Sequence, residues 1–335
     1  MLILLTNLQL NSNYVMAIFN RLNLKAKSLI NTGFGASASS YGGRFINKDG
    51  SANAVKKGIG VLDRISWYHT MLDMPSWKFL SILFLFYICI NFVFALLYFG
   101  IGIEHLNGIH ATDDVLVQFG QAYFFSAQTF TTVGYGHISP TGFYTSALSS
   151  AEALMGLLSF AIATGLFFGR FSKPSIFLKF SENAIIAPFN NGKALMFRLA
   201  PYKNTNYIDA EVNVTLGMQI EENGVTTNNF FTLDLEYQKI NSLALSWTLV
   251  HPITSESPLY DLKASDYDSI TGEIIVVVKT FDDMFSTTVA TRTSYTFVEV
   301  VYGAKFKPMY SKSENNQSTV LDMGLLNAFD KIAID

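Results

Sequence analysis

The feature that most constrains this chain is a pair of long, nearly uncharged segments. Residues 79–103 are 25 consecutive residues without a charged side chain, and residues 143–168 form a second run that only Glu152 interrupts. About 20 apolar residues in a helix are enough to cross the ~30 Å hydrocarbon core of a bilayer. The sequence therefore predicts two transmembrane helices, over residues 77–102 and 142–171.

Composition excludes several classes of protein. Charged residues make up 15% of the 335 residues, and the formal net charge is -3. Soluble proteins carry roughly 25% charged residues, and a nucleic-acid-binding protein shows a basic stripe, which this chain lacks. The single cysteine, Cys89, lies inside the first apolar run, so no intrachain disulfide is expected. We expect a membrane protein without a nucleic-acid partner.

Basic residues predict the orientation, because cytoplasmic segments are enriched in Lys and Arg. No Lys or Arg lies between the two apolar runs. Basic residues flank the runs on their outer sides: Arg21, Lys25, Lys27, Arg44, Lys48, Lys56, Lys57, Arg64 and Lys78 before the first, and Arg170, Lys173 and Lys179 after the second. We expect a multi-pass protein of the cell (inner) membrane with both termini in the cytoplasm.

Residues 61–75 precede the first run with apolar side chains at helical spacing. Ile65, Tyr68, Met71 and Leu72 would share one face, with charged residues between them. An amphipathic helix lying along the inner leaflet has this pattern, and Trp67 and Trp77 are suited to anchor it at the interface. A soluble linker helix is the alternative.

The segment at 114–136, between the two runs, is apolar but too short to span. It ends in the sequence TVGYG, formed by Thr132, Val133, Gly134, Tyr135 and Gly136. In potassium channels, carbonyl oxygens of this sequence replace the hydration shell of K⁺, and alternate glycines allow the backbone conformation that turns them inward. A ring needs four such strands, so a homotetramer is predicted with K⁺ as the permeant ion. A chance match in a β-turn is the alternative.

The remainder divides into an N-terminal arm at 1–60, which starts at Met1 or Met16, a soluble domain at 175–310 and a tail at 311–335. The soluble domain alternates β-rich segments with turn residues, which predicts an antiparallel sandwich. The predicted strands are residues 194–200, 208–216, 230–235, 274–280 and 294–301, and residues 320–329 of the tail could add a strand or helix to a neighbour. No metal-ligand spacing, phosphate loop or nucleophile motif appears, so neither catalysis nor a cofactor is expected.

The arrangement resembles the inward-rectifier potassium channels, particularly their bacterial members, from about Gly43 to Asp330. The likeness rests on several segments of the sequence: RFINKDG at 44–50, residues 67–80, residues 165–174, HPI at 251–253, ESPL at 256–259 and ATRTSY at 290–295. The family implies an α-helical pore domain at 76–174 joined to an immunoglobulin-like, all-β cytoplasmic sandwich. It also implies an N-terminal strand around residues 44–50.

The sequence departs from this family near the filter. Gln128 stands where a pore-helix Glu is usual, and His137 follows the filter where bacterial members tend to have Asp. We therefore expect Gln128, Thr131 and the intramembrane Glu152 to support the filter, with a purely structural Glu152 as the alternative. His137 and His251 are candidates for sensing pH, although a lone histidine more often makes only ordinary hydrogen bonds.

The second apolar run also offers a gate. Phe160, Thr164 and Phe168 are four residues apart and share a helix face, and by resemblance Phe168 matches the constriction at the cytoplasmic end. Gly165 is a candidate hinge, and ordinary helix packing is the alternative for this face. Strongly rectifying members are acidic at the position of Phe160, so strong rectification is not expected.

Residues at the cytoplasmic face of the membrane are candidates for contact with lipids. Basic side chains there attract anionic head groups, and by resemblance such lipids regulate gating. The candidate lipid-facing residues are Trp77, Lys78, Arg170, Lys173 and Lys179. Simple anchoring of the protein's orientation is the alternative.

The function predicted from the sequence is passive, potassium-selective conduction through a tetrameric pore, gated at the cytoplasmic end of the second span and through the soluble domain. One alternative is a membrane-tethered ligand-binding receptor with little conduction, which leaves the filter sequence unexplained. Another is a potassium transporter with four degraded pore repeats in one chain, whereas this chain has one intact repeat.

Overall fold

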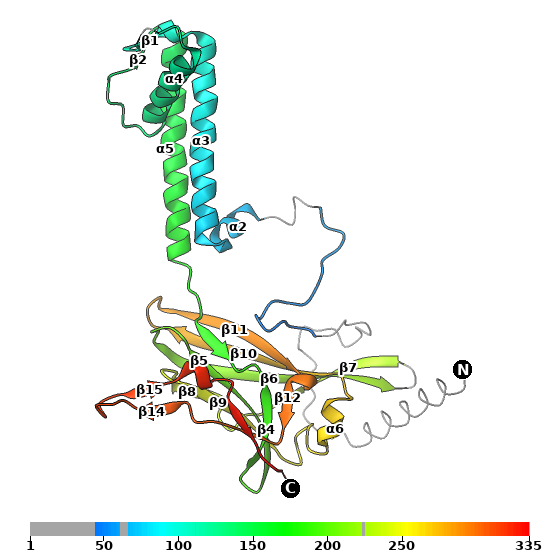
Figure 1. Cartoon of the computed structure of the whole chain (residues 1–335). Coiled ribbons are helices and arrows are strands. Elements are labelled where there is room, and N and C mark those ends of the chain that lie inside the picture. Colours follow the sequence, from blue (N-terminus) through cyan, green and yellow to red (C-terminus); the bar gives the residue numbers. More distant parts are fainter. Residues whose placement is uncertain (1–43, 61–65, 111, 223–224, 335) are drawn as a thin grey trace. The chain divides into compact units, whose positions relative to one another are not determined.

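The computed structural model describes residues 44–60, 66–110, 112–222 and 225–334. The proposed start at Met16, most of the N-terminal arm and the beginning of the predicted interfacial helix lie outside these residues. The chain divides into two compact units, one of residues 57–173 and one that combines residues up to 56 with those from 174 onward. Figure 1 shows the helices and strands of the two units.

The unit at 57–173 is helical. It contains α2 (Trp67–Asp73), α3 (Ser76–Ile101), α4 (Val115–Phe130) and α5 (Phe143–Phe171). A 3-10 turn (Ile103–His105) and the short antiparallel strands β1 (Leu106–Asn107) and β2 (Ser139–Pro140) complete it. Both α3 and α5 are long and apolar enough to span a membrane, as predicted from the two uncharged runs.

The ends of the two long helices follow from local sequence. Pro75 precedes the first residue of α3, where a missing N–H costs nothing because the first turn has no acceptor for it. Gly102 ends α3 with a φ of 119°, which residues with a side chain rarely adopt. Pro174 lies three residues after the last residue of α5, beyond the C-cap Ser172, and cannot continue a helix.

The second unit is largely β. It contains two five-stranded sheets and two small antiparallel pairs of strands. Its elements are β3 (Leu178–Phe180), β4 (Ala184–Phe189), β5 (Gly192–Pro201), β6 (Tyr207–Glu222), β7 (Val225–Thr232), β8 (Lys239–Ser242), β9 (Trp247–Ile253), α6 (Ala264–Tyr267), β10 (Gly272–Asp282), β11 (Thr287–Thr296), β12 (Val300–Tyr302), β13 (Ala304–Phe306), β14 (Tyr310–Lys312), β15 (Thr319–Leu321) and β16 (Phe329–Lys331), with 3-10 turns at Phe297–Glu299 and Met323–Leu325.

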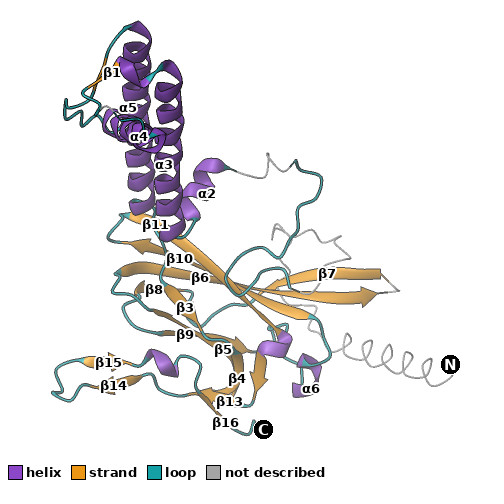
Figure 2. Ribbon diagram, turned by 45° about the horizontal axis from the view of Figure 1, so that its top comes forward, coloured by secondary structure: helices purple, strands orange, loops and turns teal. Residues whose placement is uncertain are grey.

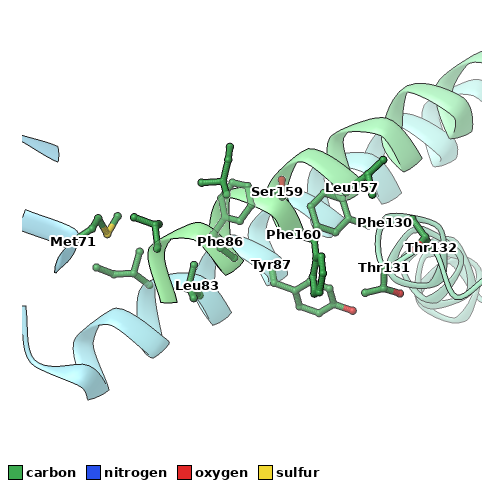
Figure 3. Close-up of a pocket in the computed structure, with 15 residues that line it drawn as sticks. Met71, Leu83, Phe86, Tyr87, Phe130, Thr131, Thr132, Leu157, Ser159 and Phe160 are labelled. Carbon is green, nitrogen blue, oxygen red and sulfur yellow. The ribbon is translucent and has the colours of Figure 1, made fainter. Parts of the chain in front are cut away.

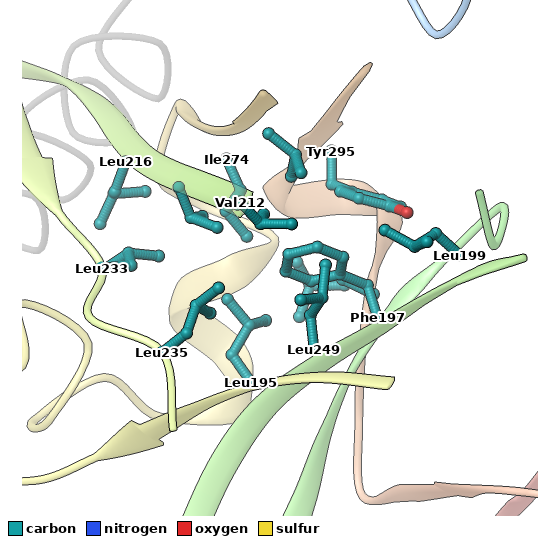
Figure 4. Close-up of a cluster of buried hydrophobic side chains, with 14 of the residues drawn as sticks. Leu195, Phe197, Leu199, Val212, Leu216, Leu233, Leu235, Leu249, Ile274 and Tyr295 are labelled. Carbon is teal, nitrogen blue, oxygen red and sulfur yellow. The ribbon is translucent and has the colours of Figure 1, made fainter. Parts of the chain in front are cut away.

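The two large sheets share one hydrophobic core. The first has the order β11-β10-β6-β7, with β8 also paired to β6, and the second has the order β12-β4-β5-β3, with β9 also paired to β5 (Figure 2). Leu195, Phe197 and Leu249 from the second sheet pack in one cluster with Val212 and Ile274 from the first (Figure 4). The period-two alternation of buried residues along β9 is the pattern of a strand with one face in this core.

One predicted strand is wrong in its middle. Residues 294–301 form the end of β11, then a 3-10 turn, then β12. The Glu299 carboxylate accepts a hydrogen bond from the Thr296 backbone N–H at 2.8 Å, so a capping interaction closes the turn. After this turn, β12 joins the other sheet parallel to β4, in an otherwise antiparallel arrangement.

The segment expected to be an N-terminal strand is instead a turn with one isolated bridge, between Ile46 and Ala52. Side chains from β10 and β11 bind its backbone. The buried Glu273 carboxylate accepts from the N–H groups of Phe45 and Ile46, and Ser294 Oγ donates to the Ile46 carbonyl at 2.5 Å. These side chains satisfy the backbone groups that a strand partner would otherwise bind.

The tail packs on its own chain. β13 pairs with β16, and β14 pairs with β15. Val320 lies within β15 and Phe329 within β16, so these residues have partner strands without a neighbouring subunit.

Candidate pore segment and its supports

The short helix α4 is held against α3 by aromatic packing. Tyr98 and Phe125 have ring centroids 5.0 Å apart, and Phe94, Ala95 and Ala122 complete the buried cluster. At the other end, Asp114 caps α4, since its carboxylate accepts from the Leu116 N–H at 2.9 Å. The predicted segment 114–136 is therefore a helix of 16 residues followed directly by the filter sequence.

The filter sequence leaves α4 through left-handed backbone conformations. Gly134 and Gly136 have φ values of 50° and 78°, as expected from their lack of a Cβ. Thr132 also has a positive φ, 58°. This was not expected, because a β-branched residue pays roughly 1–3 kcal/mol in this region. The surrounding structure must supply that free energy.

Backbone hydrogen bonds fold the start of the filter sequence onto the end of α4. The Gln128 carbonyl accepts from the N–H groups of Val133, at 3.0 Å, and Gly134, at 3.3 Å. Thr131 Oγ1 donates to the Ala127 carbonyl at 2.7 Å. Gln128 thus acts on the filter sequence through its backbone, so the identity of its side chain matters less for these bonds than the sequence suggested.

Glu152 lies in a buried polar cluster that joins α3, α4 and α5. Its carboxylate accepts from Tyr98 Oη on α3 at 2.6 Å and from Ser126 Oγ on α4 at 2.5 Å. Ser126 Oγ is also 3.0 Å from Asn91 Oδ1, and Asn91 Nδ2 donates to the Tyr87 carbonyl at 2.6 Å. Asn91, Tyr98, Ser126 and Glu152 are all fully buried.

Sequence reasoning had singled out Glu152 but missed Asn91, Tyr98 and Ser126. A signal was available, because Asn91 is the one amide in the first uncharged run. A polar side chain in a membrane helix usually faces other protein groups and hydrogen-bonds to them. The partners themselves come from different helices and could only be found in three dimensions.

A close backbone contact joins α5 to the end of α4. A Cβ added to Gly156 would lie 1.8 Å from the Phe130 carbonyl oxygen, far inside van der Waals contact. Glycine is therefore required where α5 passes the last residue of α4. The contact lies one turn after Glu152, so hydrogen bonds and close packing act on the same stretch of the two helices.

Arg170 holds the end of α2. Its guanidinium donates to the carbonyls of Met71 at 2.6 Å and Met74 at 2.7 Å, close to the C-terminus of α2, where carbonyls lack partners within the helix. It also lies 4.7 Å from the Phe79 ring centroid. Lys173 forms an ion pair with Asp73. Two of the predicted lipid-facing cations therefore also bind groups of their own chain.

The other predicted lipid-facing residues lie at exposed positions. Trp77 is 66% exposed and Lys78 Nζ is 5.5 Å from its ring. Lys179, in β3 of the other unit, lies 5.4 Å from the Tyr202 ring. Four of the five predicted residues thus belong to the helical unit, and Lys179 belongs to the other unit.

The predicted gate residues occupy an uncovered face of α5. Phe160 and Phe168 are each 73% exposed, and a Cβ on Gly165 would meet nothing within 4 Å. Thr164 Oγ1 donates to the Phe160 carbonyl at 2.8 Å. Large apolar side chains with no partner in their own chain mark a surface for lipid, another subunit or a pore.

An apolar groove of about 680 Å³ opens beside this face. Figure 3 shows side chains from α3, α5 and the end of α4 around it, including Phe86, Tyr87, Phe130, Leu157 and Phe160. Thr131 and Thr132 also line it, so the groove reaches the beginning of the filter sequence.

Comparison with known proteins identifies both units. Residues 178–334 match the family model of the inward rectifier potassium channel C-terminal domain, and residues 82–173 match an ion channel model. Inward rectifier potassium channel Kirbac3.1 of Paramagnetospirillum magnetotacticum is 31% identical over 84% of this chain and 94% of its own length.

Animal proteins match less closely. Inward rectifier potassium channel irk-1 of Caenorhabditis elegans is 24% identical over 85% of this chain, and ATP-sensitive inward rectifier potassium channel 14 of Homo sapiens is 25% identical over 80% of it. The matches span 56% and 65% of those two proteins. Among solved structures, a sporulation control protein, Spo0M of Bacillus subtilis, matches 37% of this chain and 49% of its own, with 10% identity and a TM-score of 0.18, too low to carry an argument. The chain belongs to the inward-rectifier potassium channel family and is a potassium channel subunit.

Proposed function

We propose that four copies of this chain form a passive, potassium-selective pore in the cell (inner) membrane, with both termini in the cytoplasm. The observation that carries this proposal is the segment that follows α4, which contains one filter sequence per chain and lies between two apolar helices. The carbonyls of Thr132, Val133, Gly134 and Tyr135, with the Thr132 hydroxyl, would replace the hydration shell of K⁺. The soluble unit would be an immunoglobulin-like vestibule in the cytoplasm.

The uncovered faces of α3 and α5 support assembly. The groove beside Phe160 and the exposed rings of Phe160 and Phe168 leave large apolar areas without partners in the chain. Lipid covers such a surface as well as protein does, but Thr131 and Thr132 at one end of the groove lie next to the proposed ion path. Irregular backbone at membrane depth persists only where protein surrounds it or it lines a water-filled cavity.

Rubidium uptake into proteoliposomes tests the proposed conduction. Vesicles with wild-type protein should take up Rb⁺, and competing Na⁺ should not slow this uptake. Gly134→Asp should abolish uptake because it adds a side chain at a residue whose φ is 50°. Gly192→Asp is the matched control: this glycine begins β5, and its Cβ would meet nothing within 4 Å. Equal uptake by Gly134→Asp and wild type would refute the proposed filter.

We propose Phe168 as the gate at the cytoplasmic end of α5. Four phenylalanine rings at one level can close a pore by excluding water. Phe168→Ala should then raise basal Rb⁺ uptake several-fold. Phe171→Ala is the control, because Phe171 is similarly exposed, at 77%, lies one turn away and faces Phe167 in a stacked contact. A gate elsewhere would leave both variants at the wild-type rate.

Regulation by anionic lipid is a further part of the proposal. Lys78 is the clearest lipid candidate, because Arg170 and Lys173 already bind groups of α2 and the segment after it. Each basic residue near an anionic surface contributes about 1 kcal/mol to attraction. Uptake should therefore change when anionic lipid is titrated, and Lys78→Gln should weaken that response.

One observation favours a membrane-tethered receptor as the second candidate. A groove of about 1120 Å³ in the β unit is lined by both apolar and polar residues, many of them from the β4–β5 hairpin and the region around α6, and its polar and charged residues include Asn190, Lys193, Asp261 and Lys263. Such a groove suits a small ligand with both apolar and polar groups. If folded tetramers show no Rb⁺ flux in any lipid mixture, the result would favour the receptor function over conduction.

A further inference from the structure

Three of the chain's five histidines lie in the region between α3 and α5. His105 ends the 3-10 turn after α3, His110 follows β1, and His137 comes directly after Gly136 of the filter sequence. The remaining two, His69 and His251, lie in α2 and β9. An imidazole is the commonest metal ligand in proteins, so the arrangement of the three matters.

Two of these rings face each other across the loop. The ring centroids of His110 and His137 are 6.0 Å apart with an interplanar angle of 50°, and both side chains are exposed. Within the described part of the chain, no hydrogen bond occupies a ring nitrogen of either residue, whereas His251 uses both of its ring nitrogens. The nitrogens of the pair are therefore available to a ligand from solution.

The backbone beneath both rings is fixed. β1 and β2 pair antiparallel, with Asn107 opposite Ser139, and bring the two segments together. A Cβ on Gly108 would lie 1.9 Å from the His137 carbonyl oxygen, so glycine is required for this approach. The Gln121 side chain binds both backbone groups of His110, accepting from its N–H at 2.8 Å and donating to its carbonyl at 3.2 Å.

The spacing suits one shared metal ion. With a metal–nitrogen bond of about 2.1 Å, each ring centre would lie about 3.2 Å from the ion, and a tetrahedral angle would place the ring centres about 5.2 Å apart. Rotation of two exposed side chains closes the remaining difference from 6.0 Å. Imidazole pairs prefer Zn²⁺, Ni²⁺ and Cu²⁺ to Mg²⁺ or Ca²⁺, which prefer oxygen ligands.

The surrounding charge favours a cation. The segment between α3 and α5 carries Glu104, Asp113 and Asp114 and has no Lys or Arg, so its field attracts dications. No group of three His, Cys, Asp or Glu side chains able to hold a metal occurs among the described residues. Water would therefore complete the coordination, and binding should be weaker than at a structural zinc site with four protein ligands.

We propose that His110 and His137 form a binding site for a transition-metal dication of the Zn²⁺ class beside the filter sequence. A bound dication next to Gly136 would raise the electrostatic potential on the approach to the filter and slow the entry of K⁺. This consequence for flux depends on the proposed pore, but the metal site does not.

Zinc titration of the purified full-length chain tests the site. With any purification tag removed, calorimetry at pH 7.5 should show saturable binding of Zn²⁺ to the wild type. His110→Asn and His137→Asn should each weaken it at least tenfold. His105→Asn is the matched control, because it removes a histidine of the same loop outside the pair.

Elution as wild-type tetramers on size exclusion shows that the variants fold. Equal affinity of His110→Asn, His137→Asn and wild type would overturn the proposal, as would an equal loss in His105→Asn, which would indicate nonspecific binding to loop histidines. Rubidium uptake with Zn²⁺ on both sides of the vesicle is a separate readout. Inhibition of uptake by Zn²⁺ in the wild type but not in His110→Asn would support the effect on flux. Zinc binding without any inhibition of uptake would support the metal site but contradict the effect on flux.

Discussion

The two units of this chain are both rich in apolar residues but use them in opposite ways. In the most apolar windows of α3 and α5, only 17% and 11% of residues are buried within the chain. In β10, by contrast, eight of eleven residues are buried. Burial from water stabilises the β unit, whereas lipid is as apolar as a leucine side chain and gives the membrane helices no such gain.

What lies inside each unit differs accordingly. The centre of the membrane unit is a hydrogen-bonded cluster of Asn91, Tyr98, Ser126 and Glu152. The centre of the β unit is a large apolar cluster built from both sheets. We infer that a few specific contacts determine the geometry of the membrane unit, whereas total buried area determines the stability of the β unit.

The largest expected effect comes from Gly156→Ala. The new methyl group would lie 1.8 Å from the Phe130 carbonyl oxygen, so α5 must move away from the end of α4. Rubidium uptake should be nearly abolished, while the thermal unfolding of the β unit stays unchanged. Gly100→Ala in α3 is the control, because its methyl group would meet nothing within 4 Å. Wild-type uptake by Gly156→Ala would show that this contact does not determine the pore.

Phe197→Ala tests the other half of the comparison. Phe197 is fully buried, 5.3 Å from the Tyr295 ring centroid, and truncation of such a ring costs about 3–5 kcal/mol. The β unit should unfold at a clearly lower temperature. Phe84→Ala removes the same ring from a 66% exposed position on α3 and should change stability little. Similar losses in both variants would contradict the contrast between the units.

Two substitutions at Glu152 separate hydrogen bonding from charge. Glu152→Ala leaves Tyr98 Oη without its acceptor and frees Ser126, which should destabilise the helical unit by about 1–3 kcal/mol. Glu152→Gln can still accept from Tyr98 and can donate to Ser126, whose own proton is then available to Asn91 Oδ1. Glu152→Gln should retain most of the uptake, and the thermal stability of the helical unit measures the effects of both substitutions. Equal losses in both variants would indicate that the carboxylate charge itself is needed.

The smallest expected effect is a pH dependence in the β unit. Burial lowers the pKa of His251, whose Nδ1 is 2.6 Å from the Asp234 carbonyl and whose Nε2 is 2.8 Å from Ser257 Oγ. Above about pH 6.5, the ordinary value, the ring is neutral in both folded and unfolded chains. Below pH 6.5, His251 binds a proton more readily in the unfolded chain than in the folded chain. The free energy of unfolding therefore decreases as the pH is lowered, until the pH reaches the lowered pKa of the folded state.

Hydrogen exchange of residues 254–262, corrected for intrinsic rates, measures this effect, because Ser257 is the partner of His251. Exchange should quicken below pH 6.5 in the wild type. His251→Asn should remove that pH dependence, although it lowers stability at every pH. An unchanged pH profile in His251→Asn would assign the titration to another group.

Local patterns predicted some elements well and others poorly. The two spans and the largely β character of the second unit are predicted from charge-free runs and period-two alternation. The structure shows two helices long and apolar enough to cross a membrane and a second unit that consists largely of strands. The predicted strand at 294–301 failed because Glu299 caps a turn within it, and the segment at 44–50 is a turn because side chains from β10 and β11 bind its backbone. Such competing side-chain contacts are not visible in hydrophobic patterns.

The sequence by itself determined the membrane spans, the filter sequence with its two glycines, and the family, because these depend on residue type over short, continuous stretches. Only the tertiary structure revealed the partners of Glu152, the requirement for glycine at 156, the contacts of Arg170 with α2 and the facing rings of His110 and His137. Each of these contacts joins residues that are distant in sequence. Their distances depend on how whole helices and loops pack, and no local pattern records that packing.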